Sequence, residues 1–378
     1  MGTNRYDNSI KTFFALLRAG LWADTNLDVN LNPNDYIDWE KVYQLAEEQS
    51  VIGFVLAGIE HSNVKPPQEF LLQWIGEVQV IEQRNKEMNA FIAELIEKLR
   101  KADIYALLVK GQGIAQCYEK PLWRCSGDVD LLLSYDNYQK AKTLLTPLAS
   151  EVEIEYKGFK HLGMTIDGWI IELHGSLRVG LANRINRELD DIQTDTFCRG
   201  NVSSWNNDGT QIFMLGKEND IVYLFVHFLN HFYKGGVGLR QICDWCRLLW
   251  KHRYVIDEKK IESRIRKMGL TSEWRAFAAF AVEYLGMPME SMPLYSPDAK
   301  WKRKADMICS FIIEVGNLGH NRDMSYFEKY PYLIQKIYSM GRRFNDLIRH
   351  ARIFPLDSLR FFPTILFNGL RSAVRGEG

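Results

Sequence analysis

A short stretch of strand-like sequence interrupts a chain that is otherwise patterned for helices, and this interruption limits the folds that the chain can adopt. Apolar residues recur at helical spacing in 9–19, 39–60, 67–102, 220–232, 238–250 and 258–268. Residues 104–109 instead form a compact apolar run between charged residues, as expected of a buried strand. We therefore expect helices, then a small mixed sheet, then more helices.

Three further strands complete the expected sheet. Residues 129–133 form a second apolar run. The segments 162–166 and 169–174 flank Asp167-Gly168, a dipeptide that strongly favours a two-residue hairpin turn. Strands mixed with helices in this order predict an α+β core.

Composition excludes several classes of protein. Lys plus Arg equals Asp plus Glu at 47 each, so no global field draws the chain to nucleic acid or anionic lipid. Charged residues interrupt the first twenty positions, and no apolar stretch is long enough to span a bilayer, so we expect neither a signal peptide nor a membrane segment. The six cysteines are scattered as in a reduced, cytoplasmic protein, which is the location we expect.

Asp128 and Asp130 are the first candidates for chemistry. They lie two apart at the start of strand 129–133, so their side chains share one face, roughly 6 to 7 Å apart along the backbone. Two such carboxylates repel unless a cation lies between them, and Mg²⁺ prefers oxygen ligands. For the same reason Asp130→Asn is expected to leave the metal-free fold intact or more stable. The alternative is a solvated strand start without function.

Glu172 strengthens the interpretation of Asp128 and Asp130 as part of a metal site. It lies in the apolar strand 169–174 and shares a face with His174. If this strand pairs beside 129–133, Glu172 completes a set of three carboxylates that can hold two metals roughly 3.5 to 4 Å apart, for in-line phosphoryl transfer. The alternatives are a surface Glu172 on an edge strand and a structural His174 at a strand end; otherwise His174 would touch the substrate.

The segment 109–113 joins the first strand to a short helix, where backbone N–H groups and the positive helix end suit a phosphate. Gly111 permits close approach of a ligand to the backbone. Lys110 and Arg124 add positive charge for phosphate oxygens. A Lys-Gly pair alone is common in turns, so this prediction depends on the neighbouring carboxylates.

Taken together, these motifs resemble the uncharacterised bacterial nucleotidyltransferase family of the DNA polymerase beta superfamily. The resemblance implies that adjacent strands carry three metal-binding catalytic carboxylates, here Asp128, Asp130 and Glu172, and that the loop after the first strand receives a triphosphate. The superfamily's usual Gly-Ser or Gly-Gly pair is Gly111-Gln112 here. The residues that carry the resemblance are Leu107 to Gly111, Ala115, Tyr118, Pro121, Arg124, Gly127 to Leu132 and Ile171 to His174.

The sequence therefore predicts a chain of three regions with one enzymatic activity. We expect an N-terminal helical region at 1–102, a nucleotidyltransferase core at 103–200 and a C-terminal helical region at 201–378. The expected activity is Mg²⁺-dependent transfer of a nucleoside monophosphate from a nucleoside triphosphate to an unknown acceptor. The alternative is a non-catalytic nucleotide-binding or regulatory protein with the same fold. The expected nucleotide-binding residues are Lys110, Gly111, Gln112, Gly113, Arg124 and His174.

Two residue pairs in the C-terminal region resemble metal sites. His227 and His231 have the i, i+4 spacing of a zinc pair, but no carboxylate stands between them as in a zinc protease. Hydrogen-bonded core histidines and contact with the nucleotide or acceptor are the favoured alternatives. Cys243 and Cys246 have Cys-x-x-Cys spacing without a second pair, so we expect core thiols.

Charged residues of the C-terminal region admit mainly structural interpretations. Arg240 and Asp244 stand at i, i+4 and are expected to form a pair along one helix. From Pro331 onward, eight Lys or Arg stand against three acids, with apolar residues between them. Amphipathic helices with basic outer faces explain this pattern, so a nucleic-acid partner is not favoured.

Overall fold

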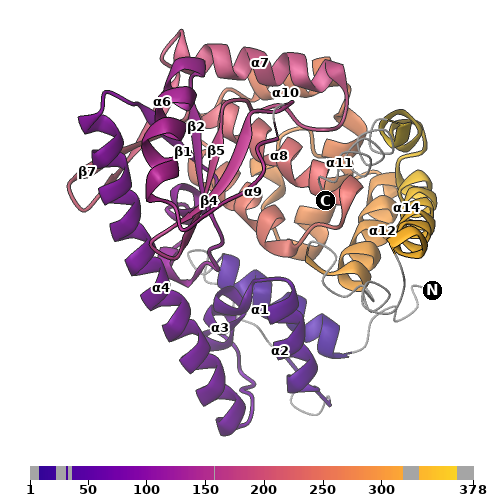
Figure 1. The fold of residues 1–378 in the computed structure, drawn as a ribbon. Helices are drawn as coiled ribbons and strands as arrows, with labels where there is room; N and C mark the ends of the chain where they lie inside the picture. The colour runs from indigo at the N-terminus through magenta and orange to yellow at the C-terminus, as the bar shows by residue number, and fades with distance from the viewer. Residues whose placement is uncertain (1–7, 23–30, 33–35, 157, 318–331, 364–378) are drawn as a thin grey trace.

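The computed structural model describes residues 8–22, 31–32, 36–156, 158–317 and 332–363. Figure 1 shows a twisted sheet with the long helix α4 along one side and helices α8 and α9 on the other. Helices α1, α2 and α3 pack beside one end of α4, and α12 and α14 lie at the opposite edge of the molecule. The expected α+β fold, a mixed sheet flanked by helices, is confirmed.

The helices and strands have the following bounds. The strands are β1 (Ala106–Val109), β2 (Val129–Leu133), β3 (Glu151–Val152), β4 (His161–Ile166), β5 (Trp169–His174), β6 (Val202–Asn207) and β7 (Thr210–Leu215). The first helices are α1 (Asn8–Leu21), α2 (Trp39–Glu48), α3 (Ile52–Glu60), α4 (Gln68–Lys101), α5 (Gly111–Ala115), α6 (Tyr135–Leu145) and α7 (Asn183–Phe197). The later helices are α8 (Lys217–Lys234), α9 (Leu239–His252), α10 (Glu258–Met268), α11 (Thr271–Leu285), α12 (Ala299–Val315) and α14 (Tyr332–Ile353).

The seven strands run in the order β3-β4-β5-β2-β1-β7-β6. β2 pairs parallel with β5 and antiparallel with β1, and β4 and β5 form the expected hairpin around Asp167 and Gly168. Both turn residues have positive φ, as a two-residue hairpin turn of this kind requires. The hairpin therefore lies directly beside the strand that carries the Asp-x-Asp motif.

Successive side chains of the central strands alternate between two apolar clusters, one on each face of the sheet. Leu108, Leu131 and Leu133 belong to a cluster built with α4 and α6. Leu107 and Leu132 belong to the larger cluster, which includes α8 and α9. Because side chains alternate between faces, even-numbered residues of β2 point toward α8. This face is the one available for a site.

Two expectations about the elements were wrong. The region from residue 201 was expected to be helical, but it opens with the hairpin of β6 and β7, and β7 pairs parallel with β1. The pairing extends the sheet beyond residue 200, since the outer edge of β1 would otherwise be unpaired. The single helix expected at 39–60 is divided into α2 and α3 at Ser50, whose φ of 55° ends helical geometry.

Among the described helices, none is long and apolar enough to cross a membrane. The basic segment that was expected to form amphipathic helices is described only at 332–363, where α14 runs from Tyr332 to Ile353. The rest of that segment lies outside the described residues.

Candidate active site

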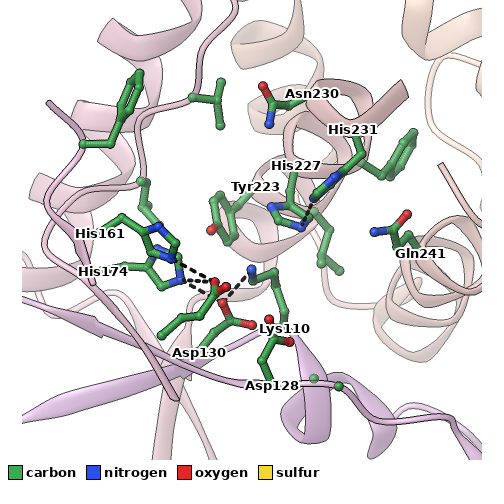
Figure 2. Close-up of a pocket in the computed structure, with 18 of the residues that line it drawn as sticks. Lys110, Asp128, Asp130, His161, His174, Tyr223, His227, Asn230, His231 and Gln241 are labelled. Carbon is green, nitrogen blue, oxygen red and sulfur yellow. Dashed lines mark hydrogen bonds and ion pairs between the residues drawn. The ribbon is translucent and has the colours of Figure 1, made fainter. Parts of the chain in front are cut away.

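A cavity of about 530 Å³ opens between the sheet and helices α8 and α9. Figure 2 shows Lys110, Asp128 and Asp130 on the sheet side, and His227 and His231 on the helix that faces them. Strand β5 supplies Glu172 and His174 to the same cavity. Residues of four separate elements, far apart in sequence, therefore surround one space.

The three predicted carboxylates meet in this cavity. β2 and β5 pair so that Asp130 lies directly beside Glu172 in the sheet. Asp128, Asp130 and Glu172 can each place a carboxylate oxygen within 4.8 Å of the others. The parallel register is the physical cause, because paired residues of adjacent strands point to the same face.

Asp130 is buried and is contacted by two cationic or ionisable groups. Lys110 Nζ and His174 Nε2 each lie 2.7 Å from Asp130 Oδ1. These contacts remove the basis for expecting Asp130→Asn to stabilise the protein, because the substitution would leave the largely buried Lys110 ammonium without its carboxylate. Attractive contacts with Lys110 and His174 therefore hold the Asp130 carboxylate in place.

Asp128 carries the repulsion that the sequence predicted for the cluster. Its pKa is raised, first by the charge of Asp130, then by burial, and further by Glu172. Lys110 opposes this effect only in part. A carboxylate whose negative charge is disfavoured by its neighbours is suited to binding a cation that restores that charge.

Glu172 lies against two histidines from adjacent strands. His161 of β4 and His174 of β5 are cross-strand partners whose rings stack with centroids 4.8 Å apart. Their Nε2 atoms lie 3.1 Å and 3.3 Å from Glu172 Oε2. Burial would raise the pKa of Glu172, but its contacts with the two histidines hold that pKa well below its usual range. Burial likewise opposes, but does not prevent, a raised pKa at His174, whose partners are Asp130 and Glu172.

The turn after β1 places Lys110 at the cavity. Lys110 has φ of 62° and Gly111 has φ of 50°, so the residue before α5 and the first residue of α5 both adopt the left-handed region. This conformation is unfavourable for lysine, and the ion pair with Asp130 stabilises it. Burial would lower the pKa of Lys110, but the neighbouring carboxylates, Asp130 above all, raise it, so its ammonium stays charged.

Gln112 and Gly113, both predicted to bind nucleotide, point elsewhere. Gln112 is buried and donates a hydrogen bond of 2.9 Å from Nε2 to Asn85 Oδ1 on α4. A Cβ atom at Gly113 would lie 2.5 Å from the Met214 Sδ atom of β7. Neither residue lines the cavity, which Lys110 and Gly111 do. Packing of α5 against its neighbours therefore accounts for both residues.

Arg124 reaches the cavity wall but is bound by an acid. Its Nε and Nη2 atoms donate to the two carboxylate oxygens of Asp244 at 2.9 and 2.7 Å. Tyr118 Oη also donates to Asp244 Oδ1, at 2.8 Å. Asp244 was expected to pair with Arg240 along α9, but this buried, bidentate pair with Arg124 replaces that contact. Arg124 is thus committed to the fold.

The pairs that resembled metal sites have different environments. His227 and His231 line the cavity, with Nε2 atoms 3.1 Å apart, and burial lowers both pKa values, that of His231 to about 4. They therefore form a neutral, hydrogen-bonded pair, which was a favoured interpretation. Cys243 and Cys246 are free, buried thiols whose pKa values are raised by burial, so the expected core role is confirmed.

Comparison with known proteins identifies the family of this chain. A family model described as an uncharacterised nucleotidyltransferase matches residues 35–286, more than half of the chain. The chain belongs to this family. One solved structure, an antigenic nucleotidyltransferase-like protein from Paracoccidioides brasiliensis, is 13% identical, with a TM-score of 0.31 over 48% of this chain and 87% of that one. No curated protein matches.

The donor set of this family member fits a hard divalent cation. Three carboxylates from adjacent strands offer oxygen ligands within 4.8 Å of one another, and a second group of potential ligands, His161, Glu172 and His174, shares Glu172. An all-oxygen set is the kind that Mg²⁺ prefers. The residues present are therefore compatible with magnesium at Asp128, Asp130 and Glu172.

His161 and Tyr223 line the site but were not among the predicted residues. The signal for His161 was present: in a two-residue hairpin turning at Asp167 and Gly168, residue 161 must oppose residue 174. No comparable signal existed for Tyr223, because it depends on how α8 packs across the sheet.

Proposed function

We propose that this protein is a Mg²⁺-dependent nucleotidyltransferase of the polymerase beta superfamily, which transfers a nucleoside monophosphate from a nucleoside triphosphate to a hydroxyl or phosphate acceptor. The observation that carries the proposal is the meeting of Asp128, Asp130 and Glu172 in one cavity. Membership of a nucleotidyltransferase family supports it independently.

Each part of the cavity has a role in this proposal. Asp128, Asp130 and Glu172 would hold Mg²⁺, which when bound supplies charge neutralisation for the phosphates and activates the attacking oxygen. The Lys110-Gly111 turn would receive the triphosphate, with the Lys110 ammonium as a fixed positive charge. His174 would orient Asp130 and Glu172, since it contacts both carboxylates.

One contact favours a second candidate, a nucleotide-binding protein without turnover. Lys110 Nζ occupies Asp130 Oδ1 at 2.7 Å, so an internal cation already neutralises the central carboxylate. A protein that uses lysine in place of a metal would bind nucleotide without completing transfer.

Nucleotide and metal titrations separate the two candidates. The thermal midpoint of the full chain would be measured with each of four nucleoside triphosphates, with and without Mg²⁺, followed by an assay for pyrophosphate release. A transferase is expected to be stabilised by one or more triphosphates only when Mg²⁺ is present, and to release pyrophosphate when an acceptor is supplied. Stabilisation that is independent of Mg²⁺, with no pyrophosphate, would support the binding protein and refute transfer.

A further inference from the structure

Arg240 is a cation in the cavity wall on which Asp244 and Asp128 act through their charge, without a direct ion pair among the described residues. It stands in the first turn of α9, and it lines the same cavity as Asp128. Its Nη1 donates to the backbone carbonyl of Cys125 at 2.7 Å. In the described part of the chain, its buried Nε has no hydrogen-bond partner, and the guanidinium forms no salt bridge within 4.0 Å.

The acid on the same helix as Arg240 is already bound by another arginine. Asp244, one helical turn away, has both carboxylate oxygens engaged by Arg124. Two guanidinium groups therefore face a single carboxylate. Burial, and then the charge of Arg124, lower the pKa of Arg240. A guanidinium nonetheless stays protonated in proteins, so Arg240 keeps its positive charge.

Two other arginines that line the same cavity are each paired with an acid. Arg178 lines the same cavity, but its Nε and Nη2 donate to Asp190 at 2.8 and 2.6 Å. Arg124 is neutralised by Asp244. Burial of an unpaired charge is costly, and such groups are retained where a ligand supplies the partner.

We propose that Arg240 forms an anion subsite in the cavity wall, which takes a phosphate group of a ligand lying beside the carboxylate cluster. The planar fork of guanidinium matches phosphate oxygens. Protein atoms cover Nε, so the terminal guanidinium nitrogens would make the contact; among the described residues only Nη1 has a hydrogen-bond partner. Asp128 and Arg240 line the same cavity and interact through their charges, so the bound phosphate would adjoin the proposed metal ligands. The existence of the anion subsite does not depend on the proposed function. Only the identity of the molecule that carries the phosphate rests on that function.

Tripolyphosphate is a direct probe, because it carries the phosphate chain without a nucleoside. Binding to the full chain would be measured by calorimetry and by thermal midpoint, without metal, in chloride buffer at matched ionic strength. We expect Arg240→Gln to weaken tripolyphosphate binding by about tenfold or more, as for loss of a charge-assisted contact. Arg178→Gln is the matched control, and it should bind like the wild type.

Two further measurements keep the inference testable. If Arg240→Gln does not fold, Arg240→Lys keeps the charge and can still donate to Cys125, yet it loses the planar fork, so weaker binding is expected. Equal affinity in wild type and Arg240→Lys, or equal losses in the Arg240 and Arg178 variants, would overturn the subsite. An Arg240→Gln protein that folds and binds tripolyphosphate like the wild type would overturn it as well.

Competition identifies the source of the phosphate. If a nucleoside triphosphate displaces tripolyphosphate, the subsite serves the donor. If a simple monophosphate ester binds with Arg240 dependence while the triphosphate is already bound, the subsite serves a phosphorylated acceptor. Arg240-dependent anion binding without any turnover would leave the subsite in place and refute only the transferase. Turnover together with anion binding that does not depend on Arg240 would refute the subsite and leave the transferase in place.

Discussion

Neutralising Asp128 and neutralising Asp130 should move the stability of the metal-free protein in opposite directions. The two residues are separated by one position, with Asp130 in β2 and Asp128 directly before it, yet their surroundings differ. Asp130 Oδ1 is contacted by Lys110 and His174, both at 2.7 Å. The pKa of Asp128 is raised, mainly by the charge of Asp130. Asn is nearly the same size as Asp, so both substitutions change charge with little change in packing.

The distances give the expected magnitudes. Two like charges 4.8 Å apart, the limit of separation in the cluster, repel by about 3 kcal/mol at an effective dielectric constant of about 20. Asp128→Asn removes this repulsion and loses a smaller attraction to Lys110, so we expect a gain of about 1 kcal/mol. Asp130→Asn leaves a largely buried ammonium without its anion, which costs about 3 kcal/mol.

Urea unfolding in chelator measures both changes, and calorimetric titration with Mg²⁺ measures the function. Both variants should bind Mg²⁺ more weakly than the wild type, because each loses an anionic oxygen ligand. Only Asp130→Asn should also be less stable. If both variants are destabilised to the same extent, the repulsion assigned to Asp128 is wrong. If either variant binds Mg²⁺ with unchanged affinity, that residue is not a ligand.

Three further substitutions test other assignments. Burial, with help from Asp244, raises the pKa of Asp220 to about 7, so its stabilising protonated form is lost as pH rises through that value. Asp220→Asn should therefore gain about 2 kcal/mol over the wild type between pH 5 and pH 8 in unfolding curves, and a pH-independent difference would contradict the shift. Asp244→Asn should destabilise by about 3 kcal/mol, because it weakens the buried pair with Arg124; a change near zero in the same assay would count against that pair. Gly113→Ala should cost about 1 kcal/mol through overpacking on Met214 while nucleotide affinity is unchanged, and a selective loss of affinity would restore its phosphate role.

The sequence by itself determined four of the strands, β1, β2, β4 and β5, and the content of the carboxylate cluster. Alternation along 129–133 separates Asp128 and Asp130 from the apolar face, and the Asp167-Gly168 turn fixes which residues of the hairpin oppose each other. These features depend on neighbours a few residues away, so periodicity and turn chemistry are sufficient to predict them. The parallel pairing of β2 with β5 was a conditional expectation, and it is the step that brings Glu172 to the aspartates.

Only the tertiary structure decided which charges are already neutralised. The sequence predicted that Arg124 binds phosphate, and the i, i+4 spacing favoured a pair between Arg240 and Asp244. The packing of α9 against the loop before β2 instead gives Asp244 to Arg124, 120 residues away in the chain. In the same way, only the fold brings Lys110 into its ion pair with Asp130 and Gln112 into its hydrogen bond with Asn85. A long side chain can reach several partners, and its choice depends on burial and on competing contacts that are set by the assembled fold, which local spacing does not encode.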